Sequence, residues 1–266
     1  MDFVKKLAEI QPKSREIALF FIAQAGFCIK TSSGKLIYID PYLSDACERL
    51  FGFKRMIPAV ITPEQVDADL YLITHHHADH LDPDTIPIVA RNAKTVFVSA
   101  PDGESFLKEQ KIPATRRHIL KEGDRMDWEN VSIKAIYADH GDLAPDAIGY
   151  LIEVDGIKVY HAGDTAYRPD QIVASLATTV DILIAPINGQ YNNMTAVEAC
   201  RLAAAVNPSI VIPSHFWMFL EHVSENGHGD PATFLRESAN SLKHIQAKVM
   251  APGEHLIYSG KHPAVS

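Results

Sequence analysis

Residues 74–82 read Thr-His-His-His-Ala-Asp-His-Leu-Asp, with four histidines and one aspartate between His75 and His80. The stretch directly follows the apolar run 70–73, Leu-Tyr-Leu-Ile, which predicts a buried strand. A strand ending in imidazoles and a carboxylate delivers them to the edge of a sheet, where a short loop can arrange them around a cation. Such nitrogen and oxygen ligands suit zinc, iron or manganese. The sequence therefore predicts a metal site, with a solvent-exposed histidine loop as the alternative.

The composition is that of a globular protein with an acidic charge. The 266 residues suffice for one domain with a sizeable core, and 47% are hydrophobic. The net charge of -8 argues against a nucleic-acid or membrane surface, which needs clustered Lys and Arg. Cys28, Cys47 and Cys200 form no CxxC pair, and the longest apolar run, 17–23, is too short to span a membrane. We therefore predict a single cytoplasmic domain over residues 1–266, and a homo-oligomer is compatible with it.

The order of the predicted elements indicates two similar β-rich halves. The hairpin 26–40 and the hairpin 149–164 look like copies, since each has a Gly turn, a Tyr near the end of its second strand and a closing Asp. Residues 42–63 lack periodicity and are predicted to be a loop over the strand ends. Strands are predicted at 17–22, 26–31, 35–39, 70–73, 95–99, 116–120, 131–137, 148–154, 157–160, 181–185, 209–213, 247–250 and 256–258. Helices are predicted at 1–10, 83–91, 103–110, 196–206 and 231–244.

Every candidate metal ligand directly follows a predicted strand. Strand ends on one edge of a β-sandwich converge in space even when they are distant in sequence, so we expect these side chains to meet. The set holds five histidines and two carboxylates, which is too many for one four-coordinate ion and suits two ions that share a carboxylate. Its members are His75, His77, Asp79, His80, His140, Asp164 and His215.

This pattern, His-x-His-x-Asp-His with a later lone His, a Gly-Asp pair and a final His, resembles the metallo-β-lactamase superfamily. The resemblance extends from Gly26 to about Tyr258 and implies the α+β four-layer αββα sandwich of that superfamily. It also implies how the ligands divide. One ion would be held by His75, His77 and His140, the second by Asp79, His80 and His215, with Asp164 between them.

Further segments are similar to the L-ascorbate-6-phosphate lactonase group. They are 161–164 (His-Ala-Gly-Asp), 193–195 (Asn-Met-Thr), 198–199 (Glu-Ala) and 211–216 (Val-Ile-Pro-Ser-His-Phe). That group opens a cyclic ester of a phosphorylated sugar acid. The resemblance therefore implies a lactone or ester of a small anionic metabolite as substrate, and two divalent ions, zinc or manganese with iron as a third candidate. The chain lacks the basic residue that those lactonases carry in the segment matching 189–192.

The chemistry expected of such a site is hydrolysis. One zinc alone lowers the pKa of a bound water to about 7, so water between two ions yields a hydroxide that attacks the ester or lactone. Asp79 is the candidate catalytic residue, either as proton acceptor or as a ligand only. A phosphodiesterase with the same metal site is the closest alternative, and a non-catalytic metal-binding scaffold is the more distant one.

Other polar residues are candidates for supporting roles. The resemblance makes Asp40 a residue that orients the histidine-rich loop, with a turn cap as the alternative. His161 either orients a ligand or packs in the core, and His76 is expected to point away from the ions. Candidates for binding substrate oxygens or an anionic group are Asn188, Tyr191, Asn192, Asn193 and Arg168. The Gly-rich loop between His222 and His228 is either a lid or a solvated loop.

Overall fold

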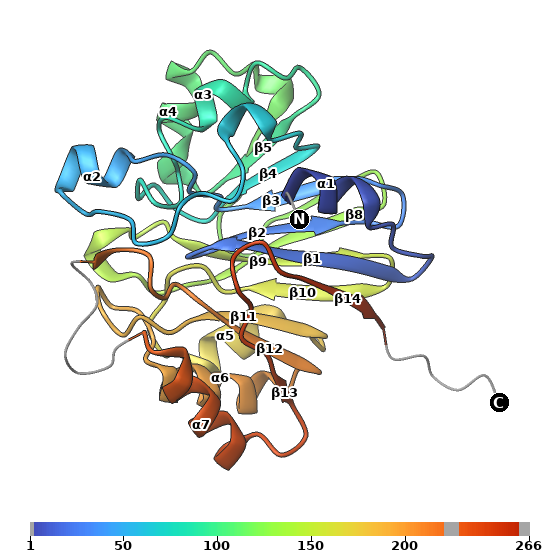
Figure 1. Ribbon diagram of the computed structural model, residues 1–266, viewed down its shortest axis with the longest axis vertical. Coiled ribbons are helices and arrows are strands. Elements are labelled where there is room, and N and C mark those ends of the chain that lie inside the picture. The colour runs from blue at the N-terminus through green and yellow to red at the C-terminus, as the bar shows by residue number, and fades with distance from the viewer. Residues whose placement is uncertain (1–2, 221–228, 261–266) are drawn as a thin grey trace.

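Two seven-stranded mixed sheets form the centre of the protein, and helices cover the outer face of each sheet (Figure 1). The computed structural model describes residues 3–220 and 229–260. The first sheet has the order β14 (His255–Ser259), β1 (Glu16–Ala23), β2 (Gly26–Lys30), β3 (Leu36–Ile39), β4 (Leu70–Ile73), β5 (Val96–Ser99) and β6 (Arg117–Ile119). The second has the order β13 (Gln246–Ala247), β12 (Ile210–Ser214), β11 (Ile182–Pro186), β10 (Ile157–His161), β9 (Ile148–Val154), β8 (Val131–Tyr137) and β7 (Arg125–Trp128).

The two sheets repeat one pattern of pairing, which confirms the predicted αββα sandwich with two similar halves. In the first sheet β14, β1, β2 and β3 pair antiparallel, and β3 to β6 pair parallel. In the second sheet β7, β8, β9 and β10 pair antiparallel, and β10 to β13 pair parallel. The hairpins β2–β3 and β9–β10 thus occupy equivalent places. Asp155 and Gly156, at φ 55 and 77, form the predicted tight turn of the second hairpin.

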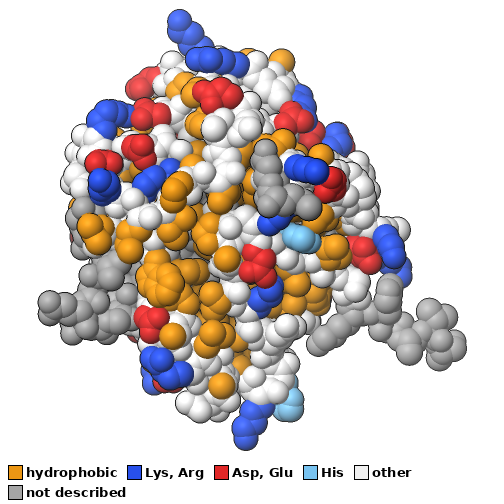
Figure 2. Space-filling model, in the orientation of Figure 1, with side chains coloured by type: hydrophobic (Ala, Val, Ile, Leu, Met, Phe, Trp, Pro, Cys, Tyr) orange, Lys and Arg blue, Asp and Glu red, His pale blue; other side chains and the backbone are white. Residues whose placement is uncertain are grey.

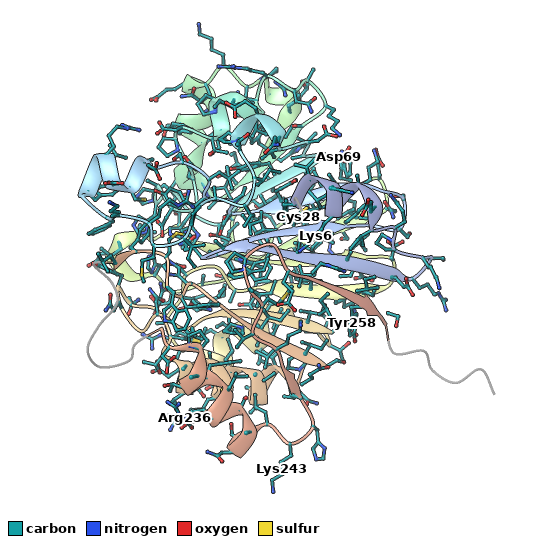
Figure 3. All side chains as sticks on the ribbon, in the orientation of Figure 1. Lys6, Cys28, Asp69, Arg236, Lys243 and Tyr258 are labelled. Carbon is teal, nitrogen blue, oxygen red and sulfur yellow. The ribbon has the colours of Figure 1, made fainter. Side chains whose placement is uncertain are left out.

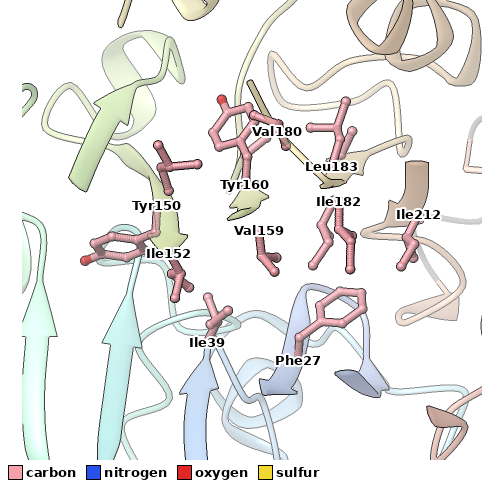
Figure 4. Close-up of a cluster of buried hydrophobic side chains, with 14 of the residues drawn as sticks. Phe27, Ile39, Tyr150, Ile152, Val159, Tyr160, Val180, Ile182, Leu183 and Ile212 are labelled. Carbon is pink, nitrogen blue, oxygen red and sulfur yellow. The ribbon is translucent and has the colours of Figure 1, made fainter. Parts of the chain in front are cut away.

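The core lies in layers because both faces of the central strands are buried. Along β1, Ile17, Leu19 and Phe21 face the other sheet, while Ala18 and Phe20 face the helices. This alternation has the period of two that a strand requires. Between the sheets, Phe27 and Ile39 of the first sheet face Ile152 and Val159 of the second, as Figure 4 shows.

Seven helices cover the sheets in the described ranges 3–220 and 229–260. They are α1 (Phe3–Glu9), α2 (Ala46–Phe51), α3 (Ile86–Val89), α4 (Glu104–Glu109), α5 (Pro169–Leu176), α6 (Ala196–Val206) and α7 (Pro231–Ser241). Side chains of α1, α3 and α4 pack on the first sheet, and those of α5, α6 and α7 pack on the second. The predicted capping box of α6 is present, since Thr195 and Glu198 exchange hydrogen bonds. None of these helices is both long and apolar enough to cross a membrane.

Hydrogen bonds fix the first helix and the last strand to the rest of the molecule. Lys6 of α1 donates to the carbonyl of Gly253 at 2.8 Å, and the hydroxyl of Tyr258 on β14 lies 3.2 Å from Asp181 Oδ1 (Figure 3). Because Asp181 precedes β11, the second contact joins the two sheets at the end away from the histidine-rich loop.

Several predicted bounds were wrong, for identifiable reasons. The segment 42–63 was predicted to be a loop but contains α2. The charged and aromatic residues of this short helix show no helical periodicity. The helix predicted at 83–91 is reduced to α3. The Asp82 carboxylate does accept from the backbone N–H groups of Asp84 and Thr85, as a cap would, and it also accepts from those of Leu43 and Ser44. The last helix ends at Ser241 rather than 244, and the strand predicted at 247–250 is only Gln246–Ala247. Strand β7 and helix α5 were not predicted at all.

Candidate metal centre

The histidine-rich loop leaves β4 at the edge where most of the strand ends of both sheets meet, on the side of the molecule that carries α2 (Figure 1). The backbone N–H groups of His80 and Leu81 both donate to the carbonyl of His77, so the loop makes a tight turn. Asp82 then holds the end of the loop against Leu43 and Ser44 at 2.9 Å. This turn points the side chains between His75 and His80 toward one centre.

Three imidazoles form the first part of the cluster, which we call the imidazole triad: His75, His77 and His140. His77 Nδ1 lies 2.9 Å from His75 Nε2 and 3.3 Å from His140 Nε2. Burial lowers the pKa of all three rings, well below its ordinary value for His75 and to about 4 for His140. The triad is therefore neutral at pH 7, which is the form in which imidazole binds a metal ion.

A second group, which we call the mixed triad, consists of Asp79, His80 and His215. Asp79 Oδ2 lies 3.7 Å from His80 Nε2 and 3.4 Å from His215 Nε2. Burial lowers the pKa of His215, but Asp164 and Asp79 outweigh it and raise that pKa to about 9. Burial likewise raises the pKa of Asp79, but His80 and His215 bring it to about 2. The pKa of His80 is raised well above its usual value by Asp164 and Asp79 against the effect of burial.

Asp164 lies between the two triads. Its carboxylate oxygens are 3.3 Å from His80, 3.2 Å from His215 and 3.7 Å from His140. Burial raises its pKa, but His215 and His80 hold the pKa well below its usual value, so the group is ionised. Gly163 precedes it at φ 63, and a Cβ there would lie 3.0 Å from the Ile148 carbonyl and from Thr74. Only glycine fits this approach, which brings Asp164 over the loop.

The seven side chains fit a metal centre by their chemistry and by what they leave unpaired. Three overlapping groups have ligand atoms within 4.8 Å of one another, namely the imidazole triad, the mixed triad, and His75 with His80 and Asp164. Within the described residues, the buried atoms Asp164 Oδ1 and His140 Nδ1 have no hydrogen-bond partner. Unpaired buried polar atoms are costly, and a cation would satisfy the carboxylate oxygen. The cluster can therefore bind metal ions.

The two residues expected to orient the ligands lie beneath the cluster. Asp40 is fully buried at φ 44, accepts from the Thr74 backbone at 2.8 Å and lies 2.8 Å from His80 Nδ1. This contact leaves His80 Nε2 directed into the cluster. Among the hydrogen bonds of the described residues, His161 makes none to a ligand; its Nε2 lies 2.8 Å from the Ala25 carbonyl and its Nδ1 accepts from the Gly163 N–H. It therefore fixes the backbone that leads to Asp164. His76 points away, with Nδ1 2.7 Å from Asp102.

Gln24, which the sequence analysis did not single out, reaches into the mixed triad. Its Nε2 lies 2.6 Å from Asp79 Oδ2, 3.0 Å from His215 Nε2 and 3.4 Å from His80 Nε2. Its carbonyl accepts from the backbone of His215, and it is 1% exposed. Gln24 belongs to the turn between β1 and β2, so the strand-end argument would have found it if amides had been considered together with histidines and carboxylates.

The predicted substrate-binding residues divide into two sets. Asn188, Tyr191 and Asn193 line a cavity of about 690 Å³ that also contains His77, Asp79, His140, Asp164 and His215 in its wall. The amide of Asn193 also donates to Asp164 Oδ2 at 2.7 Å. Asn192 and Arg168 are not among the described residues that line the cavity, and their role as substrate contacts stays a prediction. Both side chains donate to Asp139. The Asn192 amide donates to the backbone carbonyl of Asp139 at 3.1 Å, and the Arg168 guanidinium donates to the Asp139 carboxylate at 2.8 Å. The predicted loop from His222 to His228 lies outside the described residues.

Comparison with known proteins agrees with this architecture. The model of the β-lactamase superfamily domain matches residues 18–215. A UPF0173 metal-dependent hydrolase from Thermoplasma acidophilum is 30% identical over 197 residues, which cover 72% of this chain and 80% of that protein. Another, from Thermococcus onnurineus, is 31% identical over 202 residues, covering 74% and 83%.

Solved structures share the fold. A metallo hydrolase from the hyperthermophilic archaeon Ignicoccus hospitalis matches with a TM-score of 0.70 and 25% identity, covering 92% of this chain and 100% of that one. The isothiocyanate hydrolase from Delia radicum gut bacteria has a TM-score of 0.70 at 19% identity over 91% and 99% of the two chains, a likeness of fold alone. Together with the family match and the relatives, these findings mean that the chain belongs to the metal-dependent hydrolases of the β-lactamase superfamily.

Proposed function

We propose that this protein is a dinuclear metal-dependent hydrolase that cleaves a lactone or ester of a small molecule, in the manner of the L-ascorbate-6-phosphate lactonase group. The observation that carries the proposal is the position of Asp164, whose carboxylate lies within 3.7 Å of His140 on one side and of His80 and His215 on the other. One carboxylate shared by two sets of ligands is the arrangement of two-metal hydrolases.

The two triads would each hold one divalent ion, zinc or manganese, with iron as a third candidate, since imidazole and carboxylate ligands accept all three. Such ions lower the pKa of bound water toward neutrality and polarise the carbonyl oxygen of an ester. The chain itself supplies the geometry. Asn193 restrains Asp164 Oδ2, Asp40 restrains His80, and His161 restrains the turn at Gly163.

Asp79 faces the cavity and is ionised at neutral pH. Its side chain is 17% exposed, and its pKa is lowered to about 2, chiefly by His80 and His215 against the effect of burial. A base with so low a pKa removes protons poorly at pH 7. We therefore assign Asp79 the roles of metal ligand and of hydrogen-bond acceptor for the attacking water, and not the role of general base.

A small molecule is the proposed substrate, and neither nucleic acid nor membrane. The net charge of -8 and the absence of Lys and Arg from the described cavity wall support this choice, because polyanion binding depends on clustered cations. The same observation disfavours the phosphodiesterase alternative, although the metal cluster alone would serve either reaction. A non-catalytic scaffold is disfavoured because the cluster opens into a cavity.

The test combines metal analysis with a substrate screen. The purified protein is assayed for metal by elemental analysis and for turnover of lactones, carboxylic esters, thioesters, phosphodiesters and, because of the isothiocyanate hydrolase of similar fold, benzyl isothiocyanate. We expect two ions per chain and turnover of lactones or esters that is lost in His77→Ala and kept in the surface control His244→Ala. Less than one ion per chain, or activity unchanged in His77→Ala, would contradict the dinuclear mechanism. Turnover confined to phosphodiesters would favour the alternative.

A further inference from the structure

The cavity above the metal cluster is walled by large apolar side chains. It has a volume of about 690 Å³, within the range of pockets that enclose small organic ligands. Five ligands of the metal cluster line it, together with six large apolar side chains from other segments. We call these six the apolar wall: Leu50, Phe51, Phe53, Phe106, Leu143 and Phe219.

The apolar wall is assembled from separate segments, and several of its members are exposed. Leu50 and Phe51 of α2 are 49% and 59% exposed, and Leu143, three residues after His140, is 46% exposed. Hydrophobic side chains gather over the part of the surface below α2, as Figure 2 shows in orange. Single exposed apolar residues are common, but several that line one cavity mark a binding site for an apolar group.

The described wall of the same cavity offers a charged substrate group no Lys or Arg. The residues that line it in the described part of the chain include no Lys or Arg, and outside the metal cluster they include the acidic residues Asp102 and Glu109. The sequence of 221–228, Glu-His-Val-Ser-Glu-Asn-Gly-His, contains neither Lys nor Arg. Arg168, the predicted anion contact, is paired with Asp139. A phosphate or carboxylate remote from the reacting carbonyl would therefore lose its water without gaining a cation, which is costly.

We propose that the substrate is an ester or lactone whose remaining part is uncharged and apolar, an alkyl or aryl group that lies against the apolar wall. This inference rests on the proposed hydrolase function and narrows it. It replaces the anionic metabolite expected from the sequence, because the cavity wall in the described residues offers no Lys or Arg to a charged group away from the ions at the reacting centre. The acyl chain and not a charged group would supply the binding energy away from that centre.

Para-nitrophenyl esters of increasing chain length provide the first test. From acetate through butyrate to hexanoate we expect kcat/KM to rise roughly fourfold for each added methylene, as burial of a CH₂ group predicts. The monoester of succinic acid matches pentanoate in length but ends in a carboxylate, and should fall at least about tenfold below it. Equal or faster turnover of the succinate would overturn the proposal.

Substitutions in the apolar wall sharpen this test. Phe51→Lys and Leu143→Lys place an ammonium at the cavity, so the pentanoate-to-succinate ratio should fall by about tenfold or more in each. Both positions are exposed, and neither contacts the metal cluster ligands through a hydrogen bond. Val173→Lys on α5, also an exposed apolar position at 41%, is the matched control and should leave the ratio unchanged. An unchanged ratio in both cavity variants would contradict the assignment of the wall.

A binding measurement separates this inference from the proposed function. Hexanohydroxamate and the analogue with a terminal carboxylate are titrated into zinc-loaded protein by calorimetry, and we expect the uncharged chain to bind at least tenfold more tightly. That preference without turnover of any ester would overturn the hydrolase proposal and leave the apolar pocket standing. Ester turnover with equal affinity for both hydroxamates would keep the hydrolase and overturn the apolar substrate.

Discussion

The imidazole triad and the mixed triad are neighbours in space but opposite in their response to protons. Burial is the main influence on the pKa values of the first triad and keeps its rings neutral, with the His140 pKa lowered to about 4. In the second, the carboxylates Asp79 and Asp164 outweigh burial and raise the His215 pKa to about 9. The two triads thus differ because the mixed triad contains the carboxylate of Asp79 and lies closer to Asp164, whereas the imidazole triad consists of imidazoles alone.

This difference follows from where each triad enters the fold. The imidazole triad joins the loop after β4 with the end of β8, and His140 lies 3.7 Å from Asp164. The mixed triad joins the same loop with the end of β12, and His215 is closer to Asp164, at 3.2 Å, and has Asp79 at 3.4 Å as well. Asp164 is therefore the residue that connects the two triads.

The largest effect is therefore expected from Asp164→Asn, which keeps the shape of the side chain and removes its charge. Residues that merely orient ligands already contribute roughly 10–100-fold to metal affinity or activity. We expect kcat/KM to fall by more than about a thousandfold, since both triads lose their common carboxylate. Elemental analysis should show fewer ions per chain, and Asp142→Asn, on the exposed turn after His140, should match the wild type. A loss of only a few-fold would mean that the triads act independently.

The next prediction concerns the stability of chelator-treated protein against pH. His215, with a pKa raised to about 9, stabilises the fold fully below its unfolded pKa of about 6.5, and this contribution is lost as the pH rises through 9. His140, with a pKa lowered to about 4, contributes above about 6.5 and loses its contribution as the pH falls through 4. Each shift corresponds to about 3 kcal/mol in the free energy of unfolding, as an order of magnitude.

Thermal unfolding followed by circular dichroism should therefore give the highest Tm near the pH where both contributions are present, about 6.5. His215→Gln should reduce the fall in Tm on the alkaline side of this maximum, and His140→Gln should reduce the fall on the acid side. A Tm that climbs steadily from neutral pH to about 9 would contradict the charged state assigned to the mixed triad.

A smaller but more direct contrast is the release of protons on metal binding. At about pH 7.5 the mixed triad must lose protons before its imidazoles can bind an ion, whereas the imidazole triad is already neutral. Calorimetric titration of zinc into chelator-treated protein, in buffers of different ionisation enthalpy, measures this release. His215→Gln should reduce it by about one proton per chain, and His77→Gln should leave the release by the remaining site unchanged. Equal reductions of proton release in the two variants would contradict the different protonation states of the two triads.

Local sequence signals predicted the parts of the molecule that depend on neighbours in the chain. The Asp155-Gly156 turn, the capping box at Thr195 and the strand before His75 each carry their structural reason within a few residues. The convergence of the seven candidate ligands was also predictable, because strand ends meet at one edge of a sandwich and histidine and aspartate are recognisable there.

Contacts between distant segments were not predictable in this way. Arg168 was predicted as a contact for an anion, and in the fold its guanidinium pairs with the carboxylate of Asp139, 29 positions away. The apolar wall includes residues of α2, a helix whose sequence shows no periodicity. Gln24 escaped notice because an amide next to a glycine-containing turn is usually a turn residue, and only the folded chain brings it to Asp79, 55 positions away.

Gln24 therefore offers the finest test of the comparison between the triads. Its Nε2 lies within 3.4 Å of all three members of the mixed triad and contacts no member of the imidazole triad among the hydrogen bonds of the described residues. An ion that binds the mixed triad would have to break the 2.6 Å hydrogen bond from this amide to Asp79, which costs roughly 1.5–3 kcal/mol for a hydrogen bond to a charged group. Gln24→Ala should consequently strengthen zinc binding at the weaker of the two calorimetric transitions by about fivefold or more, and leave the stronger one unchanged. Gln11→Ala, an exposed glutamine on the segment after α1, is the matched control. If Gln24→Ala weakened that transition instead, the amide would be a partner of the bound ion through its oxygen, and the mixed triad would have a fourth member that the imidazole triad lacks.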